Sequence, residues 1–201
     1  MGVDWRERYE RAVARYAAGE TRELDERQLV QLANSAWAAG LSLLLAGDRE
    51  EAAVWLRRSA ERYRESWSQD AWGRPIGALK ALLLAGDDAT ETAEWTLGTC
   101  LGARHQGMSV SPIGRYAETL ALLVLGRDEE AAEVAATLGD GFPADVAAAL
   151  SALASHDADA YRDAADSVRR SFEERDTFLE DVPVPDTALA LDTLAERRGL
   201  I

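Results

Sequence analysis

The sequence is short of the residues that would indicate an oxidising compartment or a metal centre. Cys100 is the single cysteine among 201 residues, so an internal disulfide is impossible and a reducing cytoplasm is the expected location. The two histidines, His105 and His156, lie far apart, and neither has a cysteine or carboxylate at a recognised ligand spacing. We therefore expect no metal and no cofactor.

Lysine is nearly missing as well, because Lys80 is the one lysine among 22 basic residues. The 36 acidic residues outnumber them and give a net charge of −14. Nucleic acids and anionic membranes are both polyanions, so this charge argues against either as a partner and favours a basic protein. Strong acidity with almost no lysine also indicates a high-GC genome, adaptation to high salt, or both. We take salt adaptation as the hypothesis.

Long apolar runs and strand-forming segments are also scarce. The longest apolar stretches, around residues 41–46 and 120–125, are far shorter than the roughly 20 residues of a membrane-spanning helix. No apolar core of a secretory signal follows Met1. Five prolines and few β-branched residues favour helix, and we predict a soluble all-α protein.

A sequence motif close to Leu-Leu-Leu-Ala-Gly-Asp, referred to below as the repeated phrase, occurs in three copies. The glycines of the copies, Gly47, Gly86 and Gly126, are 39 and 40 residues apart. A recurrence of that length is typical of stacked helical hairpins. In each version the leucines predict a core face, the glycine ends one helix and a following acid begins the next. We expect Asp48 to form a capping box with Glu51, three residues on, and Asp128 to cap the third helix of this kind.

Other glycines and aromatic residues give further expectations. Gly19 is expected to close a helix over residues 4–18, and Gly40 to let a neighbouring helix approach closely. Trp95 and Leu101 are expected to face inward from a helix over 89–103. The prediction is one domain of about ten helices, closed by a capping helix at 186–199. Its hairpin repeats cover about 25–72, 73–110, 111–141 and 142–180.

Gly40, Gly47, Ala52 and Leu56 carry a resemblance to a known family. Their small–small–Ala–large order resembles the tetratricopeptide-like repeats, in which small residues mark the close crossing of paired helices. The resemblance implies an α-solenoid of stacked antiparallel hairpins. The spacing here exceeds the repeat length of about 34 residues of that family, and Glu91 stands where its pattern has alanine.

No catalytic motif is found. Cys100 and His105 lie a little over one helical turn apart, but a buried thiol and a loop imidazole explain them more simply than a nucleophile and its base. Paired acids such as Glu129 and Glu130 are interpreted as solvated helix starts. Trp67 and Trp72 are interpreted first as covering a hairpin joint. The alternative, taken as the candidate binding site, is a polar and aromatic recess where alternate helices begin, suited to an acidic or aromatic group of a partner. Its residues are Trp72, Arg74, Arg104, His105, Arg115 and Tyr116.

The ending of the chain is the segment least like the repeats. Residues 171–187 are interpreted as a device that seals the open end of the array, with a binding element as the alternative. The last helix, which ends in Arg197-Arg198-Gly199-Leu200 after a short proline-containing link, resembles the ends of some helical-repeat immunity proteins of bacterial polymorphic-toxin systems. That resemblance implies a protein that neutralises a toxin.

The sequence therefore leaves three hypotheses for the function of this protein. The preferred one is a non-enzymatic module that binds a basic protein partner, with toxin neutralisation as its sharpest version. The second is a homo-oligomer or assembly scaffold, which predicts an outward apolar face, to be sought on the helix over 144–154. The third is an enzyme with a site near residues 100–116.

Overall fold

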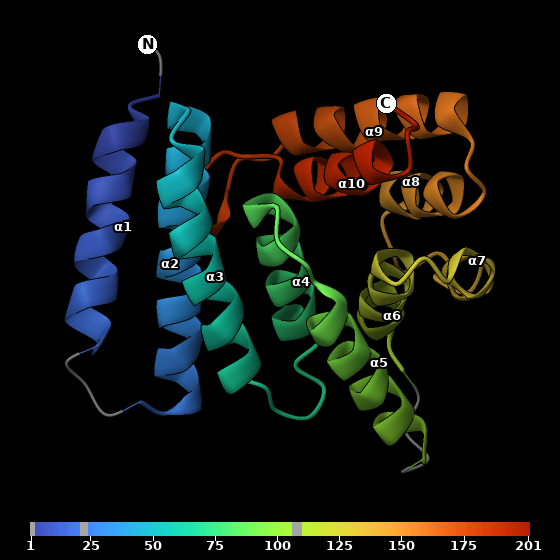
Figure 1. The fold of residues 1–201 in the computed structure, drawn as a ribbon, viewed down its shortest axis with the longest axis horizontal. Helices are drawn as coiled ribbons and strands as arrows, with labels where there is room; N and C mark the ends of the chain where they lie inside the picture. The colour runs from blue at the N-terminus through green and yellow to red at the C-terminus, as the bar shows by residue number, and fades with distance from the viewer. Residues whose placement is uncertain (1–2, 21–23, 106–109) are drawn as a thin grey trace. The chain divides into compact units, whose positions relative to one another are not determined.

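The computed structural model describes residues 3–20, 24–105 and 110–201, and these contain ten α-helices, one 3-10 helix and no strand (Figure 1). The all-α class and the helix count are confirmed. The helices are α1 (Trp5–Glu20), α2 (Glu26–Ala46), α3 (Arg49–Glu65), α4 (Gly73–Ala85), α5 (Thr90–His105), α6 (Pro112–Val124), α7 (Asp128–Ala135), α8 (Ala144–Ala154), α9 (Ala158–Glu173) and α10 (Asp186–Arg197), with the 3-10 turn η1 at Leu179–Asp181.

The chain divides into two compact units. Unit 1 comprises Met1–Asp87 and Asp176–Asp186, and unit 2 comprises Asp88–Arg175 and Thr187–Ile201. The division falls between α4 and α5, inside the hairpin predicted over 73–110. A continuous solenoid through both units stays a prediction.

In unit 1, the helices α1 to α4 pack in chain order, each against the next (Figure 1). The apolar length of α2 was underestimated, because its 21 residues make it the one described helix long and apolar enough to cross a membrane. Yet 61% of its most apolar window is buried inside the structure, as expected of a core helix between α1 and α3. The largest fully buried side chains of unit 1 are leucines: Leu32, Leu41, Leu43, Leu56, Leu79 and Leu83.

Glycines set how closely these helices approach. A Cβ added at Gly40 would lie 2.6 Å from Cγ of Leu56, which confirms the predicted close approach on α2. The prediction for Gly19 was wrong, because α1 continues through it to Glu20. A Cβ at Gly19 would lie 2.8 Å from Cδ2 of Leu32, so this glycine admits α2 and does not end α1.

The repeated phrase is a helix joint, as predicted. At the first joint Gly47 has φ +89°, its N–H donates to the Leu44 carbonyl at 3.2 Å, and the next N–H, of Asp48, donates to Leu43 at 2.9 Å. Gly86 and Gly126 repeat both bonds with positive φ. These paired bonds satisfy carbonyls that the end of a helix leaves open.

The helix that follows the first joint begins with a one-sided cap. The Asp48 carboxylate accepts from the N–H of Glu51 at 3.4 Å. The Glu51 carboxylate accepts from the Tyr9 hydroxyl at 2.6 Å, so the predicted capping box is replaced by a bond that ties α3 to α1. A reciprocal capping box does occur at the start of α2, between Asp25 and Gln28.

In unit 2, α5 to α9 also pack in chain order, and α10 is bonded to α9. The Asp192 carboxylate of α10 accepts from the Tyr161 hydroxyl at 2.8 Å and from Arg169 at 2.5 Å. The prediction that Leu101 faces inward was wrong, since it is 51% exposed on α5, whereas Trp95 is half-buried.

Part of the distinctive ending belongs to unit 1. The segment over 176–186 contacts α2 through η1, and it buries Val182 and Val184. Lys80 bonds the Asp186 carboxylate at 2.5 Å, and Arg15 pairs with Glu180 at 3.0 Å. This part of the 171–187 stretch is therefore packed structure.

Replacing Gly40 by alanine is expected to destabilise unit 1 by about 1–3 kcal/mol, because the new methyl group would displace Leu56 in a packed core. The matched change Gly98→Ala on α5, where nothing lies within 4 Å of an added Cβ, should instead stabilise by up to about 1 kcal/mol through helix propensity. Urea unfolding followed by circular dichroism measures both changes. A Gly40→Ala variant as stable as the parent would contradict the close approach.

Candidate functional site

The six residues predicted to form the recess divide between the two units. Trp72 and Arg74 lie in unit 1, whereas His105, Arg115 and Tyr116 lie in unit 2. The side chain of Arg104, the sixth residue, is outside the described part of the chain, as are residues 106–109 of the predicted loop. As a single site, the recess stays a prediction.

Both aromatic members are buried in their own units. Trp72 is 4% exposed and its ring lies 5.3 Å from that of Trp67. Tyr116 is 7% exposed and its ring lies 5.3 Å from that of Phe142. Their rings therefore contribute to packing and offer little area to a partner.

Of the polar side chains near residues 100–116, some are exposed and others are engaged or buried. The Arg115 guanidinium donates to the carbonyl oxygen of Thr137, just after α7. His105 is exposed at the end of α5. Cys100 is fully buried, with Sγ 3.9 Å from the Gly114 carbonyl oxygen.

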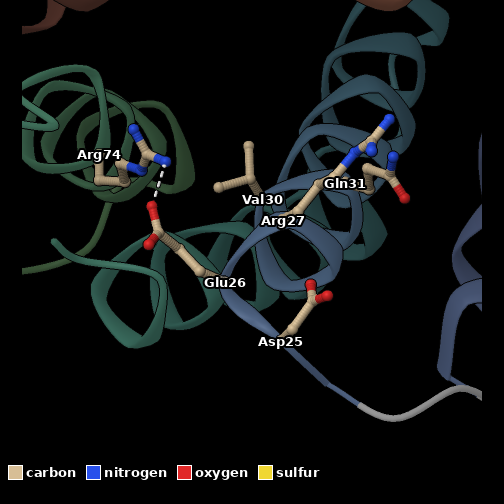
Figure 2. A pocket seen from close by; sticks show the side chains of 6 residues that line it. All are labelled: Asp25, Glu26, Arg27, Val30, Gln31 and Arg74. Carbon is tan, nitrogen blue, oxygen red and sulfur yellow. Dashed lines mark hydrogen bonds and ion pairs between the residues drawn. The ribbon is translucent and has the colours of Figure 1, made fainter.

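Arg74 lines a hollow, which we call the Arg74 groove (Figure 2). Its volume is about 570 Å³. Figure 2 shows Arg74 on one side of Val30, and Arg27 and Gln31 on the other. The lining residues come from the start of α2 and the first turn of α4: Asp25, Glu26, Arg27, Val30, Gln31 and Arg74.

Glu26 fixes one wall of this groove. Its Oε1 atom accepts from Nη2 of Arg74 at 2.9 Å and from the Ser68 hydroxyl at 2.7 Å. The buried Nε of Arg74 has no hydrogen-bond partner in the structure. Asp25 is occupied as the N-terminal cap of α2, where it accepts from the Gln28 N–H at 2.8 Å.

The other wall carries donors that no described residue engages. Within the described residues, neither Arg27 nor Gln31 makes a side-chain hydrogen bond or ion pair, and both are exposed. Sequence reasoning missed them because polar residues at the start of a helix are interpreted as its solvated face. No local signal places them opposite Arg74, 48 residues after Glu26.

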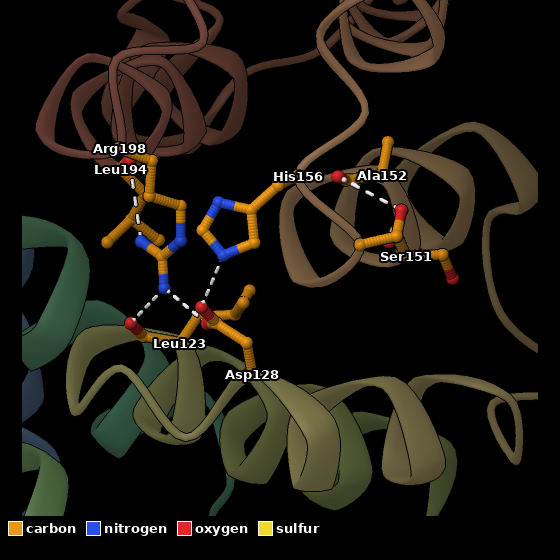
Figure 3. Close-up of polar contacts among 8 residues, drawn as sticks. Leu123, Asp128, Ser151, Ala152, His156, Leu194 and Arg198 are labelled. Carbon is orange, nitrogen blue, oxygen red and sulfur yellow. Dashed lines mark hydrogen bonds and ion pairs between the residues drawn. The ribbon is translucent and has the colours of Figure 1, made fainter.

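A second polar site, the Asp128 cluster, lies in unit 2 (Figure 3). One oxygen of Asp128 accepts from Nη2 of Arg198 at 2.7 Å, and the other lies 2.8 Å from Nε2 of His156. Nη2 of Arg198 also donates to the Leu123 carbonyl at 2.5 Å. The predicted capping role of Asp128 was wrong: it is the first residue of α7, Arg127 holds the cap position, and the carboxylate serves these partners instead.

The Asp128 cluster keeps its carboxylate ionised. Burial alone would raise the pKa of Asp128, but the hydrogen bonds from Arg198 and His156 outweigh it, and the pKa lies below its ordinary value of 3.8. Arg198 has a side chain only 9% exposed, so its charge depends on Asp128 for compensation.

The backbone at His156 shows a helix joint that the sequence search missed. His156 has φ +56°, its N–H donates to the Leu153 carbonyl at 3.3 Å, and the next N–H, of Asp157, donates to Ala152 at 3.0 Å. These are the two bonds of the Gly47 joint, with histidine where the other copies have glycine. A left-handed conformation costs a residue with a Cβ about 1–2 kcal/mol.

No group of three or more histidine, cysteine or acidic side chains in the described residues is arranged to hold a metal ion. No family model, no curated protein and no solved structure matches this chain. The two resemblances stated above therefore stay predictions.

Replacing His156 by glycine is expected to leave stability nearly unchanged, because relief of the left-handed backbone offsets the lost bond to Asp128. His156→Ala loses the bond and keeps the strain, so it should be about 1 kcal/mol less stable than the glycine variant. Ser155, whose φ is −89°, is the control: there the glycine variant should not be more stable than the alanine variant. Thermal unfolding of the four variants tests this, and equal stabilities of His156→Gly and His156→Ala would contradict it.

Asp128→Asn is expected to lower the free energy of unfolding by about 2 kcal/mol at pH 7. Since the folded pKa lies below the unfolded one, the contribution is present above about pH 4 and is lost as the pH falls through the folded value. The gap between parent and variant should therefore narrow below pH 4. Urea unfolding between pH 3 and 7 measures it, with the exposed neighbour Glu129→Gln as control; a gap independent of pH would contradict it.

Proposed function

We propose that this chain is a non-enzymatic, cytoplasmic protein-interaction module whose unit 2 holds a basic protein partner. In its sharpest version, the partner is a toxin domain that the module neutralises. The surplus of unpaired carboxylates on unit 2 is the observation that carries the proposal.

The charge is unevenly divided between the units. Unit 2 has 18 acidic and 9 basic residues, a surplus of 9 negative charges, whereas unit 1 has 18 acidic and 13 basic residues, a surplus of 5. Such a surplus attracts a positively charged partner and speeds its association.

Four of the nine basic side chains of unit 2 are already paired with carboxylates inside it. Arg127 pairs with Glu130, Arg162 with Asp159, Arg169 with Asp192 and Arg198 with Asp128, all within 2.7 Å. Exposed carboxylates without a partner among the described residues remain on three helices: Glu94 on α5, Glu129 and Glu133 on α7, and Asp163 on α9. These groups are the ones that a basic partner would meet.

The toxin-neutralising version is supported by the resemblance of the ending to helical-repeat immunity proteins, together with the small size and the acidity of the chain. The oligomer alternative is supported by a different helix than expected. On α8 the exposed positions are small, such as Ala148 and Ser151, whereas α5 exposes Leu101 beside Gly98.

The test uses the full chain as bait in native extract, followed by identification of the captured protein and measurement of its association rate. Neutralising Glu129, Glu133 and Asp163 to their amides should slow association about tenfold at low ionic strength, and salt should shrink the difference. The matched control neutralises Glu10, Glu50 and Glu61, exposed glutamates of unit 1.

An association rate that the unit 2 substitutions leave unchanged, or an equal effect of the control, would contradict the proposal. For the toxin version, the captured protein expressed alone should arrest growth of a host cell, and co-expression of this chain should restore it. A captured protein without effect on growth would reject that version and leave the binding module.

A further inference from the structure

The Arg74 groove presents hydrogen-bond donors on both sides of an apolar residue. Val30 lies between Arg74 on one side and Arg27 with Gln31 on the other (Figure 2). The carboxylates of the groove are engaged, since Asp25 caps α2 and Glu26 bonds Arg74 and Ser68. The groove therefore offers the donors of Arg27 and Gln31 on one side of a short aliphatic surface, and on the other side the donors of Arg74 that Glu26 does not hold.

The two arginines are not placed for helix stability. Arg27 and Arg74 each stand second in their helices, α2 and α4. A cation in the first turn of a helix is repelled by the positive end of the helix dipole. Arg27 offsets none of this repulsion through a partner among the described residues, which leaves its guanidinium for a ligand.

The residues that line the Arg74 groove are mostly exposed, and this indicates what kind of ligand the groove can bind. Asp25, Glu26, Arg27 and Gln31 are all exposed, so the groove cannot enclose a small molecule in the way that a typical site does. A segment of a protein brings its own surface to cover an open groove.

We infer that the Arg74 groove binds an acidic segment of a protein, with two carboxylates at the Arg27 and Arg74 sides and an aliphatic stretch between them over Val30. Charge-assisted bonds from guanidinium to carboxylate supply the recognition. The site goes beyond the proposed function, because it lies in unit 1 and takes the opposite charge from the partner proposed for unit 2.

Glu26 competes with such a ligand for Arg74. The carboxylate of Glu26 holds Nη2 of Arg74 at 2.9 Å, and the pair is partly exposed. In Glu26→Gln the amide oxygen still accepts from Ser68, but its negative charge no longer opposes an incoming acid. This substitution should therefore tighten the binding of an acidic segment, which a merely structural role of Glu26 would not predict.

The experiment is a nuclear magnetic resonance titration of the full chain with a capped tetrapeptide that has glutamates at both ends and valines between them. Shifts are expected at the amides of Arg27 and Gln31. Arg27→Gln and Arg74→Gln should each weaken binding about fivefold or more, and Glu26→Gln should strengthen it. The control is Arg11→Gln, an exposed arginine of the same unit whose ion pair with Glu7 is 3.9 Å long.

Several results would overturn the inference. Absence of binding, or equal binding of the peptide with glutamines in place of glutamates, removes the acidic ligand. Adipate binding as tightly as the peptide would make this a small-acid site. An equal loss in Arg11→Gln would mean non-specific attraction, and weaker binding by Glu26→Gln would mean that Glu26 contacts the ligand itself. Unfolding curves of each variant check that its fold is intact.

Discussion

The structure depends on how its helices end. The last carbonyls of a helix have no partner inside it and must be satisfied when the chain turns back on itself. Among the described residues, five helix ends use the same two backbone bonds around one left-handed residue. These residues are Gly47, Gly86, Gly126, His156 and Gly199.

Three of these joints in unit 2 are connected by one set of side chains. Leu123, whose carbonyl accepts from the Gly126 N–H, also accepts from Arg198 at the end of α10. Asp128, which follows the same joint, binds both Arg198 and His156. His156 therefore adopts a left-handed conformation that glycine would adopt more easily. In return, its side chain bonds Asp128, which follows the Gly126 joint. The Asp128 cluster follows from the way that helix ends gather in this unit.

The sequence predicts what is local and periodic. It predicts the glycine joints and the close approach at Gly40, because each depends on backbone conformation or on residues within one hairpin. It fails where a distant residue competes for a side chain: Asp128 leaves its capping role for Arg198, 70 residues away, and Glu51 bonds Tyr9. Likewise, Arg74 could be selected as an arginine at a helix start, but Arg27 enters the groove only because α2 packs against α3 and α3 packs against α4.

Several arginines of this chain make contacts that bear on why lysine is so scarce. Arg8, Arg115 and Arg198 each donate to a backbone carbonyl, those of Asp181, Thr137 and Leu123. Arg198 binds a carboxylate at the same time, because a guanidinium carries five donors in a planar fork whereas an ammonium is a compact point charge. The Lys80 ammonium bonds the Asp186 carboxylate and lies 5.7 Å from the centre of the Trp37 ring. At position 198, arginine thus takes part in the way that unit 2 closes its helix ends.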